Sequence, residues 1–199
     1  MRRRVRIDPL AGAAVVWLLL VERSVWALLS LGAAALHELG HLAAARFLHV
    51  PLGGMTVGAL GARIAIGDGL LSYRDEARIA AAGPAVNLLC AALAAALHRG
   101  RPDDRLLFFA AASLALGMVN LLPLPTFDGG RILACTCAQL LGTSAAGRIT
   151  RAAGAACTVA LWLLAAALWM RTGGNLSLLA LSTLLLWRVV RGNVGQYTT

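Results

Sequence analysis

The segment "VWALLSLGAAALHELGHLAAARF" (Val25–Phe47) places two histidines and a glutamate in an otherwise apolar run. At about 1.5 Å per residue, a helix of this length crosses the roughly 30 Å hydrocarbon core of a bilayer. His37 and His41 lie one helical turn apart, about 40° around the axis, so both imidazoles face the same point. Ionisable groups inside a membrane span are costly and usually mark a functional site. The segment therefore predicts a membrane span that carries a metal site.

The composition of the whole chain agrees with a membrane protein. Its 199 residues are 59% hydrophobic and only 14% charged, and the mean hydropathy is +0.76. This predicts one membrane-embedded domain over residues 1–199, since the charged fraction is far below that of soluble domains. The net charge of +9 does not indicate nucleic-acid binding. The arginines lie between apolar segments and do not interleave with aromatic residues, as a single-strand binder would require.

The apolar segments predict an all-α polytopic membrane protein with about six transmembrane helices. A glycine-rich stretch after the second span, Val50–Ala77, contains "MTVGALGARIAIG" (Met55–Gly67), whose β-branched residues in short alternation predict a β-hairpin or re-entrant sheet at the membrane surface. The Pro123–Pro125 pair should end the fourth helix, and Gly129 and Gly130 should allow a tight turn before a short apolar piece, Ile132–Leu141. The six predicted spans are Pro9–Val21, Val25–Phe47, Ile79–Leu97, Leu106–Asn120, Ala152–Met170 and Leu176–Val190.

The distribution of arginine predicts the orientation of these spans. With six spans and a cytoplasmic N-terminus, most of the arginines fall on the cytoplasmic side, and the loop at 98–105 is the main exception. Positive charge favours the cytoplasmic side of a membrane, so both termini are expected inside. The HELGH motif and the "FDGG" segment (residues 127–130) then lie toward the same, cytoplasmic face.

Two histidines on one helix face predict a zinc site with a hydrolytic role. Zinc in a catalytic site takes three protein ligands and keeps one open position, and a nearby glutamate such as Glu38 can act as general base. Asp128 is the best candidate for the third ligand, because it follows the helix-breaking prolines. Its alternative roles are the N-cap of the following helix and a partner for Arg131. His49 is a rival ligand, although its position past the span favours an interfacial role.

Three motifs together resemble those of the site-2 protease family of intramembrane zinc metalloproteases. "HELGH" (37–41), "AAGPAVN" (81–87) and "NLLPLPTFDGG" (120–130) occur in the order found in that family. The number of spans and the lack of a PDZ insertion resemble the branch that contains the sporulation protease of a pro-sigma factor. That branch often carries a CBS domain, which this sequence does not contain. Phe127 stands where the family usually has leucine, which should affect packing more than chemistry.

The resemblance implies a role for each motif residue. His37, His41 and Asp128 are implied as ligands of Zn²⁺, and Glu38 as the general base. Asn120 is implied near the scissile carbonyl, where an amide can donate to the oxyanion. Asn87 is implied to shape the site, although a helix–helix hydrogen bond explains it equally well. The segment Met55–Ile66 is implied as a strand edge for an unwound substrate, or else as a hairpin that covers the site.

These features predict an intramembrane zinc metalloendopeptidase in the lipid bilayer of a bacterial cell membrane. The implied substrate is a transmembrane or membrane-associated protein, such as a pro-sigma or anti-sigma factor. A regulatory membrane protein or a homo-oligomer is left open as a further partner, and nucleic acid is not expected. The alternative from another class is a metal transporter or a metal-sensing membrane protein. An inactive relative acting as a scaffold is a third reading, which the intact motifs disfavour.

Overall fold

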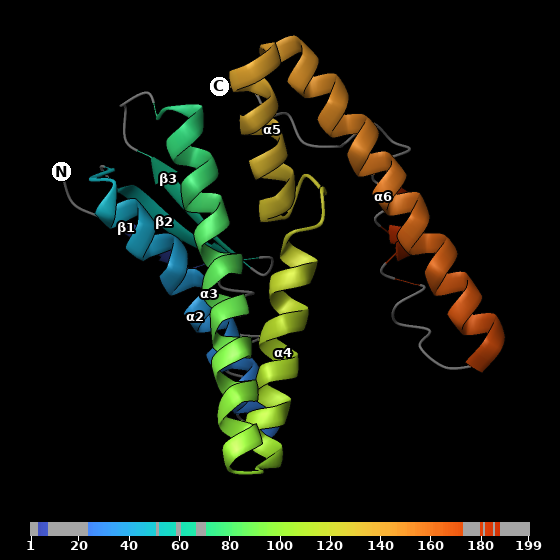
Figure 1. The fold of residues 1–199 in the computed structure, drawn as a ribbon. Coiled ribbons are helices and arrows are strands. Elements are labelled where there is room, and N and C mark those ends of the chain that lie inside the picture. Colours follow the sequence, from blue (N-terminus) through green and yellow to red (C-terminus); the bar gives the residue numbers. More distant parts are fainter. Residues whose placement is uncertain are drawn as a thin grey trace. The chain divides into compact units, whose positions relative to one another are not determined.

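The computed structural model describes residues 4–7, 24–50, 52–58, 61–66, 71–172, 180, 182–184 and 186–187. The chain forms two compact units, Met1–Asn120 and Leu121–Thr199. The elements of the first unit, drawn in blue to yellow-green in Figure 1, are β1 (Arg4–Ile7), α2 (Val25–Phe47), β2 (Leu52–Gly58), β3 (Gly61–Ile66), α3 (Tyr73–Gly100) and α4 (Asp104–Asn120). The elements of the second unit are α5 (Asp128–Leu141) and α6 (Thr143–Thr172).

Helix α2 has the bounds predicted from the sequence, Val25–Phe47. Ser24 caps its N-terminus, since its hydroxyl accepts from the Ala27 N–H at 3.3 Å. At the other end, the Leu48 N–H donates to the Ala44 carbonyl and closes the last turn. With 23 residues, α2 is roughly 34 Å long, which is sufficient to cross a membrane.

Helices α2, α3 and α4 pack against one another in the first unit. The residues that α3 and α4 turn toward this packing are mostly small, and small residues let helix backbones approach closely inside a membrane. At Gly117, for example, a Cβ would lie only 3.3 Å from the Asn87 Cβ. The buried positions of the three helices include Ala33, Ala80, Gly83, Ala91, Ala94, Ala110 and Gly117.

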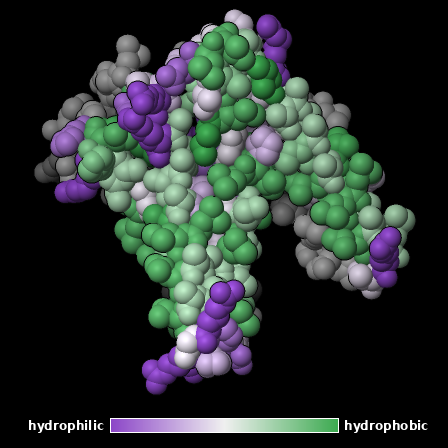
Figure 2. All heavy atoms as spheres, in the orientation of Figure 1, coloured by the Kyte–Doolittle hydropathy of each residue, from purple (hydrophilic) through white to green (hydrophobic). Residues whose placement is uncertain are grey.

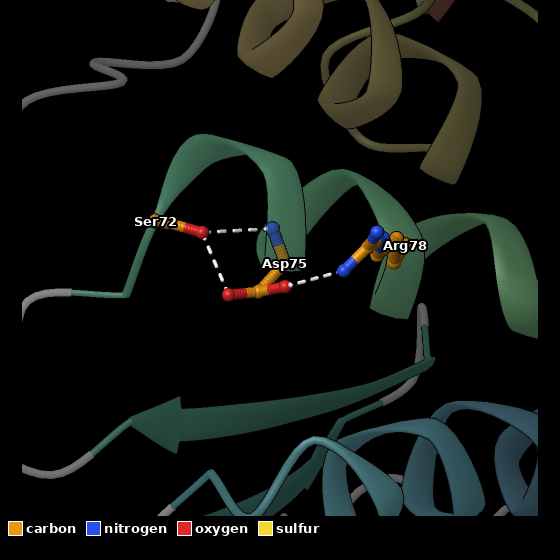
Figure 3. Close-up of polar contacts among 3 residues, drawn as sticks. All are labelled: Ser72, Asp75 and Arg78. Atoms are coloured by element: carbon orange, nitrogen blue, oxygen red, sulfur yellow. Dashed lines mark hydrogen bonds and ion pairs between the residues drawn. The ribbon is translucent and has the colours of Figure 1, made fainter.

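Helix α3 begins at Tyr73, six residues before the predicted span Ile79–Leu97. The reason is a local capping network (Figure 3). The Ser72 hydroxyl accepts from the Asp75 N–H at 3.1 Å and donates to the Asp75 carboxylate at 2.7 Å. The Arg78 guanidinium also contacts that carboxylate at 3.1 Å. These contacts support a polar first turn that hydropathy alone does not indicate.

Replacing Ser72 with alanine is expected to lower the free energy of unfolding by about 1 kcal/mol, because the Asp75 N–H then loses its cap. Thermal unfolding in detergent measures this loss. Ser72→Thr is the control, since it keeps a capping oxygen and should lie closer to wild type. Equal stability of the alanine and wild-type proteins would contradict a stabilising cap.

The strands form one three-stranded sheet in the order β1-β2-β3. Strands β2 and β3 lie inside the glycine-rich stretch and pair antiparallel, with Met55 opposite Ile64. Strand β1 was not predicted, and it pairs parallel with β2, with Arg4 opposite Gly54. Hydropathy does not indicate this strand because two of its four residues are arginine, whereas backbone pairing does not depend on side-chain type.

Three helices in the described part of the chain, α2, α3 and α6, are long and apolar enough to cross a membrane. The predicted fourth span corresponds to α4, which has 17 residues, and the predicted fifth span lies inside α6. The predicted first span, Pro9–Val21, lies outside the described residues, and most of the sixth, Leu176–Val190, does too. Apolar side chains cover the helices, and hydrophilic ones gather at the loop between α3 and α4 (Figure 2). A helical membrane protein is therefore supported.

Candidate metal centre

The two predicted histidine ligands lie together on the buried face of α2. His37 and His41 are 6% and 8% exposed, and their Nε2 atoms are 3.1 Å apart. Their rings meet nearly at right angles, with an interplanar angle of 84°. The i,i+4 spacing accounts for this convergence, as the sequence predicts.

The spacing of the two nitrogens fits a zinc ion. Two nitrogens that bind one zinc at about 2.0–2.1 Å in tetrahedral geometry lie about 3.3 Å apart. The observed 3.1 Å is close to that value without any movement of α2. The Nδ1 atom of His41 lies 2.7 Å from the Ile79 carbonyl oxygen, so this nitrogen is occupied by a second-helix contact and Nε2 is the atom that faces a metal. The pair is therefore suited to zinc.

Glu38 and His49 occupy different environments. Glu38 follows His37 on α2 and is half-buried, about 100° further around the helix. It is thus beside the histidine pair and does not share the face of α2 on which the two rings meet. His49 lies in the turn after α2, where it is exposed and has a positive φ of 53°. The interfacial role of His49 stays a prediction.

The two predicted asparagines lie on α3 and α4 of the same unit. Asn87 is fully buried, and neither polar atom of its amide has a hydrogen-bond partner among the described residues. Asn120 is the last residue of α4, and its Nδ2 donates to the Leu116 carbonyl at 3.0 Å. A helix–helix hydrogen bond, the alternative role for Asn87, is not present in the described part of the chain.

Asp128 belongs to the second unit and is the first residue of α5, where it is 9% exposed. The alternative role of Asp128 as an N-cap is not borne out, because Phe127 holds that position and makes no side-chain cap bond. Helix α5 also starts four residues before Ile132, the predicted start, because Gly129 and Gly130 are part of the helix. A carboxylate in a first helical turn is favoured by the helix dipole.

The glycines after Asp128 have a different role from the predicted tight turn. Gly129 and Gly130 are helical, and their φ angles are not positive. A Cβ at Gly129 would lie 2.6 Å from the Leu122 carbonyl oxygen, and one at Gly130 would lie 3.1 Å from the Pro125 nitrogen. The missing side chains therefore let the 121–127 loop fold directly onto the start of α5, which fixes the backbone next to Asp128.

Comparisons with known proteins agree with these features. Peptidase family M50 matches residues 95–165, which include the segment around Asp128. The Rip3 zinc metalloproteases of two Mycobacterium tuberculosis strains, Erdman and H37Rv, are each 36% identical over 129 residues. That match covers 61% of this chain and 32% of each relative, so the chain spans about a third of the length of these curated relatives.

The fold is also found in a solved structure. The site-2 protease from Methanocaldococcus jannaschii matches with a TM-score of 0.62 at 20% sequence identity, and the match covers 100% of this chain and 97% of that one. At this identity the likeness concerns the fold. The resemblance predicted from the HELGH, AAGPAVN and NLLPLPTFDGG motifs is confirmed as a similarity: the chain is similar to peptidase family M50 over residues 95–165 and to the Rip3 zinc metalloproteases, and its fold is that of a site-2 protease.

Proposed function

We propose that this protein is an intramembrane zinc metalloendopeptidase that cleaves a membrane-bound protein. The observation that carries the proposal is the histidine pair of HELGH, buried in an apolar helix with its Nε2 atoms 3.1 Å apart. A zinc metalloprotease is also the activity named for the relatives. The test is cleavage of candidate membrane substrates in proteoliposomes, compared between wild type and Glu38→Gln.

The proposed zinc ligands are His37, His41 and Asp128. The support is the donor set, two imidazole nitrogens and one carboxylate oxygen from side chains that are each at most 9% exposed. Three protein ligands with one open position is the usual arrangement of a catalytic zinc site. The chemistry supplied by a bound zinc ion is Lewis-acid polarisation of a carbonyl group and easier ionisation of water near neutral pH.

The other proposed roles follow from the placement of each side chain. Glu38 takes a proton from the attacking water and returns it to the leaving amine, as expected of a carboxylate beside the metal ligands. Asn120 donates to the oxyanion that forms on the scissile carbonyl. Its amide has two N–H groups, and the contact with the Leu116 carbonyl uses one of them. The second N–H is then available for the substrate oxygen.

Asn87 is proposed to contact the substrate or the transition state. The effects of replacing Asn87 on stability and on activity test this role. A buried amide without a partner is destabilising, so Asn87→Leu should raise the melting temperature by several degrees. We expect the same variant to lose activity, because stability and function oppose each other at functional sites.

Ser113→Ala provides the matched control for Asn87→Leu. Ser113 on α4 is also fully buried, and its hydroxyl has no hydrogen-bond partner among the described residues. Both variants should be more stable than wild type, and only the Asn87 variant should lose activity. Full activity of Asn87→Leu would leave Asn87 with a packing role.

The proposed membrane arrangement has about six spans in a single domain over residues 1–199, with both termini and the active site toward the cytoplasm. The three helices of membrane-crossing length support a polytopic arrangement. The β2–β3 pair is proposed to lie at the membrane surface, where an unwound substrate can add to a strand edge. Because β2 lies between β1 and β3, the outer edge of β3 is the proposed place for this addition.

The proposed substrate is a transmembrane or membrane-associated protein such as a pro-sigma or anti-sigma factor. A regulatory membrane protein or a second copy of the chain is a further proposed partner.

The alternative function, a metal transporter, would need further ligands along its path. Beyond the three proposed zinc ligands, the described residues contain no group of three His, Cys, Asp or Glu side chains that could hold a metal. Zinc flux in proteoliposomes without peptide cleavage would favour the transporter.

A further inference from the structure

The histidine pair on α2 is in direct contact with one turn of α3. The Nδ1 atom of His41 lies 2.7 Å from the carbonyl oxygen of Ile79. Four residues later on the same face of α3, Gly83 packs against the imidazole rings. Both of these contacts are made by the backbone of a different helix.

The Ile79 carbonyl determines the tautomer of His41. A carbonyl oxygen can only accept a hydrogen bond, so Nδ1 of His41 must carry the proton. The neutral ring then has its lone pair on Nε2, the atom that lies 3.1 Å from Nε2 of His37. A carbonyl that fixes a histidine in this way typically orients the ring and raises its basicity as a ligand.

The missing side chain of Gly83 determines how closely α3 approaches the rings. A Cβ at this position would lie 2.9 Å from Nε2 of His37 and closer still to the ring of His41. Ordinary contacts between non-bonded heavy atoms are about 3.5–4.0 Å. The atoms that such a Cβ would displace are the two nitrogens suited to the metal. Any residue larger than glycine must therefore move a ring or push α3 away.

The contact between α2 and α3 is also tight on the α2 side. Gly40 lies on α2 next to His41, and a Cβ there would be 2.8 Å from the Ala82 carbonyl and 3.1 Å from the Gly83 Cα. Because both backbones are in contact, α3 has little room to retreat from an enlarged side chain at position 83. The rings, which rotate about their side-chain bonds, would have to move instead.

We propose that the Ile79–Gly83 turn of α3 is the positioning element of the metal centre, with Gly83 as the positioning residue for His37 and His41. This proposal rests on the zinc site proposed above. The carbonyl of Ile79 holds the His41 ring in one orientation, and Gly83 leaves the space in which both Nε2 atoms converge. The geometry of the histidine pair is thus set by two helices, although both histidines come from one.

The first test is Gly83→Ala, with Co²⁺ in place of zinc in the detergent-solubilised full chain. We expect the Co²⁺ affinity to fall about tenfold or more, and the visible ligand-field spectrum to change. Gly32→Ala is the control, since Gly32 also lies in a predicted span helix and a Cβ there meets no atom within 4 Å. It should keep wild-type affinity and spectrum. A wild-type spectrum and affinity in Gly83→Ala would overturn the proposal.

A double-mutant cycle with His41→Ala keeps the test valid if Gly83→Ala folds poorly. It uses metal-free protein and compares the melting temperature, or the folded yield, of the two single variants and the double variant. We expect Gly83→Ala to be clearly less destabilising in the His41→Ala background than with His41 present, since the nearer of the two obstructing rings is then gone and only the contact with His37 Nε2 remains. Equal loss in both backgrounds would overturn the proposal, because the clash would then involve other atoms.

The two experiments separate this proposal from the proposed enzyme. If the wild-type protein binds Co²⁺ but cleaves no substrate, the proteolytic function fails while the positioning role stands. If wild type binds no Co²⁺, the zinc site fails, and the metal-free cycle still reports whether Gly83 and His41 are coupled. Only additive effects in the cycle, or an unaltered metal spectrum, count against Gly83.

Discussion

Glu38→Gln is expected to lower the rate of substrate cleavage by about 10²–10⁴-fold, the usual contribution of a general acid–base group. The substitution keeps the size of the side chain and removes the carboxylate that would accept a proton from water. Glu38 is half-buried beside His37 and is not among the proposed zinc ligands, so bound zinc should stay at the wild-type level. Cleavage in proteoliposomes and metal analysis of the same sample measure the two effects.

Glu76→Gln is the matched control for this substitution. Glu76 lies in the first turn of α3, in the polar segment that precedes the apolar part of that helix. Its replacement makes the same chemical change at a residue outside the proposed site, and it should leave the cleavage rate close to wild type. Retained cleavage in Glu38→Gln would exclude Glu38 as the base, whereas loss of zinc would show that it acts as a ligand.

The sequence predicts the motif helix well, because its signal is local. The bounds of α2 match the predicted Val25–Phe47, where hydropathy and spacing give the same answer. The convergence of His37 and His41 also depends only on helical geometry. The starts of α3 and α5 are predicted less well. At these positions a capping network at Ser72 and close backbone packing at Gly129 outweigh hydropathy and glycine propensity.

The contacts that position the site could not be predicted from the motifs. The carbonyl of Ile79 carries no side-chain signal, because every residue has a backbone acceptor. Gly83 is visible in the AAGPAVN motif, but its contact with the His41 ring depends on the register between two helices that are distant in sequence. The burial of Asn87 against Gly117 depends likewise on the packing of α3 and α4. Tertiary register, which hydropathy does not encode, decides these features.

Asp128→Ala is expected to weaken zinc binding by on the order of a hundredfold or more, since one of three protein ligands is removed. Metal titration with a competing chelator measures this loss. Asp104→Ala is the control, because Asp104 is also an acidic residue in the first turn of a helix, and is exposed. It also loses a favourable interaction with a helix dipole, so this part of any effect on folding is matched. Its zinc affinity should equal that of wild type.

His49→Ala distinguishes Asp128 from the rival ligand. His49 lies in an exposed turn after α2, so His49→Ala should change zinc affinity little. Wild-type affinity in Asp128→Ala together with a loss in His49→Ala would move the third ligand to His49 and contradict the proposal.

The response to added zinc distinguishes the proposed ligand Asp128 from the proposed base Glu38. Asp128→Ala loses cleavage because it loses zinc, and added zinc should restore part of the rate, whereas Glu38→Gln keeps its zinc and no metal concentration should restore it.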